Sequence, residues 1–305
     1  MGSNSMLIFG GAGFVGAHLV NLALQRGWHT VIADQKQPGN STFTRWRDVD
    51  ITRQDSVEQI VSDERPEVVI NVAALADIDR AERERSLAWQ INVLGAKYIA
   101  EACSKHKTRH LFFSSDAVFD GERGPYKEED ERRPLNYYGL TKVEAENAVL
   151  SICPEAVVIR VSLVLGSPLF GGNSFLAGLE EKLSTGMSVE SFSDEVRTPI
   201  DVLTLAECIL ELASGSFCGV LHLGCPQSID RYSLTLLLAR QMGYPTDLIV
   251  EQSHARIVPG RAQRHKRGIL DVSKAQHVLR TPFPDLQATI QKAVSTRGLQ
   301  VIKGE

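Results

Sequence analysis

Short apolar runs alternate with amphipathic stretches through the first half of the 305-residue chain. Five runs, at residues 7–9, 30–33, 67–72, 111–113 and 157–161, are largely continuous in their apolar residues. Continuous runs of this length are typical of strands that are buried on both faces of a sheet. Helical periodicity fills intervals at residues 15–25, 55–62 and 86–105. Alternating strands and helices predict right-handed βαβ units, and so an α/β fold with a doubly wound parallel sheet.

The remaining part of the chain has a less regular pattern. Helices are expected near residues 174–184, 203–213, 233–242 and 286–294, separated by loops that contain glycine and proline. No linker rich in proline, glycine or serine divides the two parts. We therefore predict a main domain at residues 1–165 and a smaller C-terminal α/β subdomain at residues 166–305, which interleaves with the edge of the sheet.

Composition and charge exclude several classes of protein. Hydrophobic residues form 43% of the chain and charged residues 23%, which are ordinary values for a globular protein. No apolar run approaches the roughly 20 residues that cross a bilayer, so we expect no membrane association. The net charge of −4, from 33 Lys and Arg against 37 Asp and Glu, provides no basic field that would attract nucleic acid.

The cysteines and histidines give no sign of a metal site. The five cysteines are scattered without a Cys-x-x-Cys pair, and the eight histidines form no cluster with ligand spacing. We expect no metal, and we interpret the cysteines as small buried side chains in a reducing, cytoplasmic location. Residues 1–6 are too polar and too short for a signal peptide.

A glycine-rich turn follows the first predicted strand. Gly10, Gly13 and Gly16 form a G-x-x-G-x-x-G pattern that runs into a helix, with Phe14 and Val15 at the junction. Glycine allows the tight turn, the approach of backbone to a pyrophosphate, and close packing of the helix on the strand. The helix N-terminus offers N–H groups and a partial positive charge to phosphates. The pattern predicts a dinucleotide site on a Rossmann-type fold, although a plain glycine-rich turn is the alternative for the motif alone.

The next strand ends at Asp34, 18 residues after the last glycine of that turn. A carboxylate there can accept hydrogen bonds from the adenosine ribose and would repel a 2′-phosphate. NAD(H) is therefore favoured, and NADP(H) stays open because Lys36, Arg45 and Arg47 follow closely. Residues 50–51, which are Asp50 and Ile51, are expected beside the adenine.

Tyr138 and Lys142 are spaced Y-x-x-x-K, which places both on one helix face, one turn apart. A phenol is a neutral proton donor at pH 7, and a neighbouring ammonium is expected to lower its pKa and ease proton transfer. Because this spacing arises often by chance, a second feature decides its meaning. The predicted strand at residues 111–113 ends in Ser114 and Ser115, at the edge where parallel sheets bind ligands. Ser115 can donate a hydrogen bond to a carbonyl oxygen that Tyr138 then protonates.

Together these residues resemble the extended short-chain dehydrogenase/reductases, most closely the dTDP-4-dehydrorhamnose reductase family. The likeness runs through nearly the whole chain, and the string Ser115-Asp116 followed by residues 118–121 (Val-Phe-Asp-Gly) is fairly specific for this group. The resemblance implies that Ser115, Tyr138 and Lys142 are catalytic and that Lys142 also holds the nicotinamide ribose. It further implies cofactor contacts at Ala73, Ala74 and Asn92, and substrate contacts at Ser115, Asp116, Asn173 and Arg197, the last two facing a pyrophosphate.

The resemblance implies an NAD(P)H-dependent reductase of a carbonyl substrate, a nucleotide-linked 4-keto-sugar. Residues 1–165 would then bind the cofactor and residues 166–305 the substrate, and the protein would be able to form a homodimer. Two departures from the family pattern leave the substrate open: Ala117 stands where the family has tyrosine, and Arg197 where rhamnose-pathway reductases carry glycine. A dehydratase is not expected, since Ala117 cannot replace its glutamate acid.

Two alternatives therefore stay open. One is an epimerase of sugar nucleotides that uses tightly held NAD. The other is a non-catalytic NAD(P)-binding regulatory subunit that resembles the β subunit of methionine adenosyltransferase. The basic residues Arg261, Arg264, Lys266 and Arg267 are interpreted as a solvated charged face.

Overall fold

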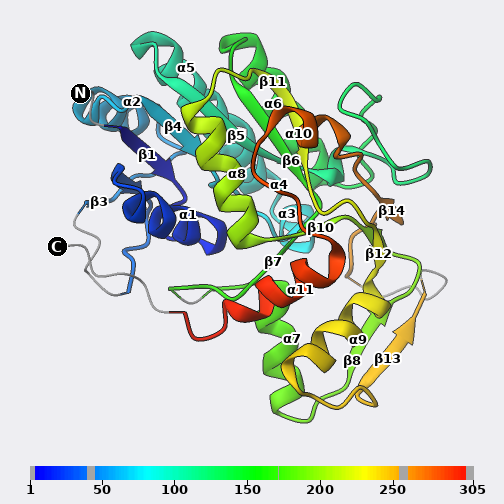
Figure 1. The fold of residues 1–305 in the computed structure, drawn as a ribbon. Coiled ribbons are helices and arrows are strands. Elements are labelled where there is room, and N and C mark those ends of the chain that lie inside the picture. The colour runs from blue at the N-terminus through cyan, green and yellow to red at the C-terminus, as the bar shows by residue number, and fades with distance from the viewer. Residues whose placement is uncertain (1–3, 40–44, 171, 254–259, 300–305) are drawn as a thin grey trace.

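The computed structural model describes residues 4–39, 45–170, 172–253 and 260–299. In this described part, a seven-stranded parallel sheet forms the centre of the molecule (Figure 1). The strand order is β11-β6-β5-β4-β1-β2-β3, so the order reverses between β1 and β4, which is the position where doubly wound sheets bind ligands. The strands are β1 Ser5–Phe9, β2 His29–Ala33, β3 Trp46–Arg47, β4 Val68–Asn71, β5 Arg109–Ser115, β6 Val157–Val161 and β11 Gly219–Leu223.

The predicted α/β class and doubly wound sheet are confirmed. All five predicted strands are present, and each pairs in parallel with its neighbours. The sequence did not indicate β11, which pairs with β6 in full register. Its run is short and His222 interrupts the apolar residues, so neither length nor periodicity marks it.

Helices cover both faces of the sheet. On one face α1 (Phe14–Gln25) packs beside α8 (Val202–Ser214), which Figure 1 shows crossing the front of the sheet. On the other face lie α2 (Gln54–Glu64), α5 (Ala96–His106) and α6 (Tyr137–Ile152). The two apolar layers bury the alternate side chains of the strands, and this double coverage explains why the strands read as continuous apolar runs.

The helix expected at residues 86–105 is interrupted. It consists of α4 (Arg85–Trp89), a π-helical turn η1 (Gln90–Gly95) and α5, and it is preceded by α3 (Ile78–Arg83). Asn92 lies in the π turn, almost fully buried, and its amide bonds to both backbone groups of Leu75, N to Oδ1 at 2.8 Å and Nδ2 to O at 3.2 Å. A side chain turned inward in this way accompanies the local widening of the helix.

The C-terminal part builds a second apolar core. Its helices are α7 (Phe175–Ser184), α9 (Arg231–Met242) and α11 (Leu286–Ser295), whereas α10 (Ser273–Val278) packs against β11 of the central sheet. Short paired strands connect it: β7 (Leu163–Leu165) with β10 (Pro199–Asp201), β8 (Val189–Phe192) with β13 (Ile249–Gln252), and β9 (Val196–Arg197) with β12 (Ile229–Asp230) and β14 (Arg267–Gly268). Both α8 and β11 come from this half of the sequence but pack on the central sheet (Figure 1). The domain boundary after residue 165 therefore stays a proposal, in which the C-terminal subdomain interleaves with the sheet. No described helix combines the length and apolar character needed to cross a bilayer.

Candidate active site

The glycine turn joins β1 to α1 at the reversal point of the sheet. Gly10 has a φ of +80°, and a Cβ there would lie 2.7 Å from the backbone nitrogen of Ala73. A Cβ on Gly16 would overlap the carbonyl oxygen of Gly10. Gly13 caps α1 without a side-chain hydrogen bond, and the first turn of that helix has no acidic residue. The turn therefore presents bare backbone and a helix N-terminus, as phosphate binding requires.

A cavity of about 360 Å³ opens beside this turn, at the carboxyl ends of β1, β2 and β4. Seven of the predicted cofactor residues line it: Gly10, Gly13, Asp34, Asp50, Ile51, Ala73 and Ala74. The sequence missed the contribution of α4 and η1, which supply Leu87, Gln90 and Ile91. Among the other predicted cofactor residues, Gly16 packs against Gly10 in the turn, and Asn92 is buried with its amide bonded to Leu75. Bare backbone where a Cβ would not fit, next to a cavity, fits the phosphates of a dinucleotide.

Asp34 links the second strand to the glycine turn. Its Oδ2 accepts a hydrogen bond from the backbone N–H of Ala12 at 3.1 Å, and its Oδ1 accepts one from the N–H of Lys36 at 3.0 Å. The two neighbouring arginines instead face Glu64: Arg47 Nη2 lies 2.9 Å and Arg45 Nη2 3.6 Å from its carboxylate oxygens. The carboxylate is thus held at the rim of the cavity, while nearby positive charge is drawn to α2.

The catalytic side chains predicted from sequence come together at the end of β5. Tyr138 and Lys142 lie on α6, whose first turn is capped by Asn136 Oδ1 accepting from the N–H of Gly139 at 2.9 Å. Tyr138 shares a side-chain hydrogen bond with Ser115, and both residues are less than a tenth exposed. Lys142 Nζ donates to the carbonyl oxygen of Phe113 at 2.8 Å and lies 5.9 Å from the centre of the Tyr138 ring.

The protonation states differ from one expectation. Burial raises the pKa of Tyr138 well above its ordinary value; the bond with Ser115 opposes this shift and the charge of Asp116 adds to it. Burial lowers the pKa of Lys142 to about 8, and the carboxylate of Glu146 opposes that shift. We expected the ammonium to lower the phenol pKa, but Lys142 faces a main-chain carbonyl and desolvation of the phenol dominates. The site therefore holds a protonated phenol, which is the form that can donate a proton.

Asp116 follows Ser115 and lies at the centre of a buried cluster. Its Oδ1 accepts from Ser115 Oγ at 3.0 Å, and its Oδ2 accepts from Ser162 Oγ at 2.7 Å and lies 2.9 Å from His265 Nε2. Burial raises the pKa of Asp116, but His265 and Arg197 outweigh it and hold this pKa below its ordinary value. Neither Ser162 nor His265 was predicted, since nothing local in the sequence connects them with Ser115.

The two residues expected at a substrate pyrophosphate lie in different surroundings. Arg197 is buried, and its guanidinium donates to the carbonyl oxygens of Val196 at 2.8 Å, Lys266 at 3.2 Å and His265 at 3.0 Å. We therefore do not carry Arg197 forward as a phosphate ligand. Asn173 is exposed and directly precedes Ser174, whose hydroxyl caps α7.

The basic residues near position 264 are only partly a solvated face. Lys266 and Arg267 are exposed, as expected. Arg264 instead pairs with Asp79 through two contacts of 3.0 and 2.9 Å, and Arg261 pairs with Glu195. Arg261 also lies over the ring of Phe192, 4.1 Å from its centre, and Arg231 lies over the ring of Phe175 at the same distance.

The guanidinium of Arg231 lies within the electrostatic influence of three other arginines. Burial lowers the pKa of Arg231 to about 10; Glu195 opposes this shift, and Arg197, Arg261 and Arg264 add to it. The lowered pKa of Arg231 shows that the three neighbouring guanidiniums lie close enough to act on it, and such a gathering of guanidiniums favours an anion.

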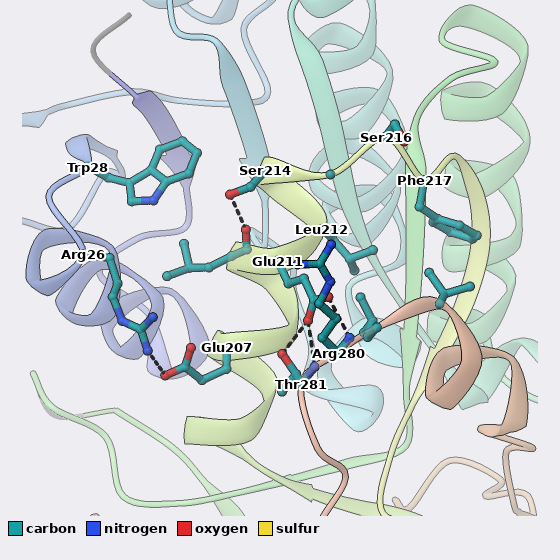
Figure 2. A pocket seen from close by; sticks show the side chains of 14 residues that line it. Arg26, Trp28, Glu207, Glu211, Leu212, Ser214, Ser216, Phe217, Arg280 and Thr281 are labelled. Atoms are coloured by element: carbon teal, nitrogen blue, oxygen red, sulfur yellow. Dashed lines mark hydrogen bonds and ion pairs between the residues drawn. The ribbon is translucent and has the colours of Figure 1, made fainter. Parts of the chain in front are cut away.

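A larger hollow, of about 990 Å³, lies elsewhere, at the end of α8 (Figure 2). Its polar groups bond with each other: Arg26 pairs with Glu207 at 2.7 Å, and Glu211 accepts from the backbone N–H groups of Arg280 and Thr281. None of the predicted site residues lines it, so size alone does not mark the reaction centre. In the described part of the chain, no three His, Cys, Asp or Glu side chains gather as a metal site would need.

Comparison with known proteins agrees with this geometry. The sequence model of the family described as RmlD substrate binding domain matches residues 4–298. The chain belongs to this family. Its members are extended short-chain dehydrogenase/reductases, and the chain is accordingly an NAD(P)-dependent oxidoreductase of that type.

Individual relatives carry the names of reductases and of a methionine adenosyltransferase subunit. The dTDP-4-dehydrorhamnose reductase of Mycobacterium tuberculosis is 31% identical over 247 residues, which cover 79% of this chain and 76% of the relative. The mouse methionine adenosyltransferase 2 subunit beta is 27% identical over 92% of this chain and 85% of its own length. The crystal structure of a dTDP-4-dehydrorhamnose reductase from Clostridium acetobutylicum has a TM-score of 0.86 at 24% identity, covering 97% of this chain and all of that one, which shows the shared fold.

Proposed function

We propose that the protein reduces the keto group of a nucleotide-linked 4-keto-sugar with NADH. The observation that carries this proposal is the protonated phenol of Tyr138, in contact with Ser115 at the end of β5. A phenol held in its acid form suits reduction, in which the carbonyl oxygen must receive a proton.

The chain's own residues divide the work at this site. The cofactor, when bound, supplies the hydride that reduces the carbonyl carbon. Tyr138 donates its phenolic proton to the carbonyl oxygen, and Ser115 keeps the phenol in place until then. Lys142 is held by the carbonyl of Phe113, where it can position the cofactor. Its ammonium can also stabilise the phenolate that proton transfer leaves on Tyr138. Burial of all three side chains keeps water from competing for the proton.

The adenosine end of the site favours NADH over NADPH. Asp34 keeps its charge at the rim of the cavity through bonds from two backbone N–H groups. The arginines that could attract a 2′-phosphate, Arg45 and Arg47, both face Glu64. A ribose with free hydroxyls matches this arrangement better than a phosphorylated one.

The positive region of the C-terminal part supports a nucleoside-diphosphate substrate. Arg231 and Arg261 each cover an aromatic ring, and Arg197 and Arg264 lie close enough to act on the pKa of Arg231. Guanidiniums suit a pyrophosphate because they bind phosphate oxygens in pairs. Asn173, exposed at the start of α7, is kept as a further candidate contact for the same group. A homodimer and a cytoplasmic location also stay proposals.

A second candidate is a non-catalytic regulatory subunit. The mouse relative named methionine adenosyltransferase 2 subunit beta is aligned over 92% of this chain. Ala117, in place of a family tyrosine, favours the same idea because it removes a polar group beside the catalytic serine. The epimerase alternative has no such specific support here.

One experiment separates these functions. The purified protein is mixed with NADH and dTDP-4-dehydrorhamnose, and absorbance at the NADH band is followed, with NADPH as the parallel reaction. The reductase proposal predicts stoichiometric oxidation of NADH to product. Binding of NADH without any oxidation across a panel of dTDP- and UDP-linked keto-sugars would contradict it and favour the regulatory subunit.

A further inference from the structure

The segment at residues 260–268 crosses from the C-terminal part to the reaction centre. It is held on both sides: Asn136 Nδ2 donates to the carbonyl of Gln263 at 2.9 Å, and Arg197 Nη2 donates to that of His265 at 3.0 Å. Asn136 is the residue that caps the helix of Tyr138. The segment therefore places the side chain of His265 with reference to the same helix that carries the catalytic phenol.

The side chain of His265 contacts Asp116. Its Nε2 lies 2.9 Å from Asp116 Oδ2, and each residue is only 3% exposed, so water does not replace this bond. The pKa of Asp116 is held below its ordinary value by His265 and Arg197 against the effect of burial. Asp116 is thus a carboxylate, which can only accept, and the ring nitrogen of His265 is the donor.

Two glycines make room for the imidazole. Gly121 has a φ of +73°, and a Cβ there would lie 2.6 Å from the Cβ of His265. A Cβ on Gly268 would overlap both His265 Nε2 and Asp116 Oδ2. Two separate stretches of backbone therefore approach the ring more closely than any other residue type would permit. The fold thus depends on two glycines to accommodate the contact between His265 and Asp116, which is not an incidental surface pair.

A chain of hydrogen bonds runs from His265 through Asp116 and Ser115 to Tyr138. With Oδ2 of Asp116 held by both His265 and Ser162, Oδ1 faces Ser115 and accepts its hydroxyl proton at 3.0 Å. The Ser115 oxygen in turn accepts from the N–H of Ala117 at 3.1 Å and is the partner of the Tyr138 phenol. Because the Ser115 proton is committed to Asp116, Ser115 offers the phenol an acceptor oxygen, which orients the phenol proton before a substrate oxygen takes it.

We propose that His265 is a positioning residue for the reduction: by fixing Asp116 it sets the direction of the Ser115 hydroxyl, and so the hydrogen bonding of Tyr138. The inference rests on the proposed function of the same site. Loss of the donor at 265 leaves Asp116 Oδ2 with Ser162 as its hydrogen-bond donor, so the carboxylate can turn and release the Ser115 hydroxyl. Ser115 would then no longer hold the Tyr138 phenol in one orientation, and proton delivery to the substrate oxygen would slow.

Two variants that differ by one methylene group test this. Glutamine places its amide nitrogen where Nε2 of histidine stands, whereas asparagine ends near the Nδ1 position, short of Asp116. His265→Asn should lower kcat with NADH and dTDP-4-dehydrorhamnose by about 10- to 100-fold, the usual cost of losing a partner that orients a functional group. KM for the sugar nucleotide and Kd for NADH should change by less than about threefold. His265→Gln should keep kcat within about threefold of the wild type. The proposal would be overturned if both variants had the same kcat, at the wild-type level or below it. A side-chain amide that extends to Asp116 would then make no difference to the reaction.

A double substitution adds a second criterion. If His265 acts through Asp116, then Asp116→Asn and His265→Asn together should lose no more activity than Asp116→Asn alone. Additive losses would contradict a path through Asp116.

A structural readout keeps this inference separate from the proposed function. Crystal structures of wild type and His265→Asn should show the Asp116–Ser115 contact, 3.0 Å in the wild type, broken in the variant. A preserved contact would overturn the positioning role. If the wild type oxidises no NADH with any keto-sugar, the proposed function fails by itself, and the crystal comparison still decides the role of His265.

Discussion

Glu146 on α6 and Arg160 on β6 form a buried ion pair, with both carboxylate oxygens engaged: Nε to Oε1 at 2.8 Å and Nη2 to Oε2 at 2.7 Å. Glu146 lies one helical turn after Lys142 and is fully buried. Burial raises the pKa of Glu146, but Arg160, Ser114 and other donors outweigh it and keep this pKa below its ordinary value. A charged carboxylate under Lys142 thus belongs to the frame that holds the reaction centre.

Breaking this ion pair should lower the free energy of unfolding. Arg160→Leu leaves a buried carboxylate with Arg132 as its remaining cation, and we expect a loss of about 3 kcal/mol in the free energy of unfolding. Denaturant unfolding measures it. The matched control is Arg133→Ala, which removes a partner from the exposed pair with Glu131 and should change the free energy of unfolding far less. Similar losses in the two variants would show that burial of the pair has no consequence.

Lys142 should make stability depend on pH in the alkaline range. Burial lowers its folded pKa to about 8, whereas the unfolded chain keeps a pKa near 10.4. Between these values the unfolded state binds one more proton than the folded state, so the wild type gains stability as pH rises from about 8 to about 10. Below pH 8 the buried charge imposes its full cost.

The variant Lys142→Met isolates this effect, since it has no amine to titrate. Urea unfolding at pH 7 and at pH 9.5 gives the difference in stability between wild type and variant at each pH. We expect that difference to shift in favour of the wild type at pH 9.5. A difference that does not change with pH would place the folded pKa of Lys142 near its unfolded value.

Asp34 should decide the choice between the two nicotinamide cofactors. Asp34→Ser removes the charge that repels a 2′-phosphate, so Kd for NADPH should fall and Kd for NADH should rise, each by about tenfold. Fluorescence titration with both cofactors measures the ratio. Asp48→Ser, an exposed aspartate on the same stretch of chain, serves as the control and should leave the ratio unchanged. An unaltered ratio in Asp34→Ser would mean that Asp34 does not face the ribose.

The glycine turn offers a comparison between two glycines of different surroundings. A Cβ on Gly16 would overlap backbone of Gly10, which cannot move without displacing the turn. Gly16→Ala should therefore abolish measurable NADH binding or prevent folding. Gly27 also has a positive φ, +76°, but nothing lies within 4 Å of a Cβ there, so Gly27→Ala should cost only about 1 kcal/mol and leave NADH binding intact. NADH titration and thermal unfolding of both variants distinguish the two cases, and normal binding by Gly16→Ala would remove the phosphate role of the turn.

Features that are local in the sequence were predictable. The spacing of Gly10, Gly13 and Gly16, and the one-turn spacing of Tyr138 and Lys142, each fix a geometry within a single turn or helix face. The strand ends that carry Ser115 and Asp34 follow from continuous apolar runs, and the structure places both at the ligand edge of the sheet. These features sufficed for the fold and for seven of the fifteen residues that line the cavity.

Features that depend on distant backbone were not predictable. Arg197 was expected to face a phosphate, but carbonyl groups about 70 positions later take its donors. His265 had no motif around it, and its contact with Asp116 exists because Gly121 and Gly268 leave space for it. Asn92 was expected at the cofactor, yet its amide joins Leu75 to Thr141 Oγ1, which lies 3.0 Å away on α6. In each case tertiary packing, which one sequence does not display, chose the partner.

The central claim is that the phenol of Tyr138 delivers the proton in a reduction, and Tyr138→Phe tests it most directly. The variant lacks only the hydroxyl, so the fold and the dinucleotide cavity should persist. We expect kcat with NADH and dTDP-4-dehydrorhamnose to fall by about 10²- to 10⁴-fold while Kd for NADH stays within about twofold. A Tyr138→Phe protein that turns over at close to the wild-type kcat would contradict the account.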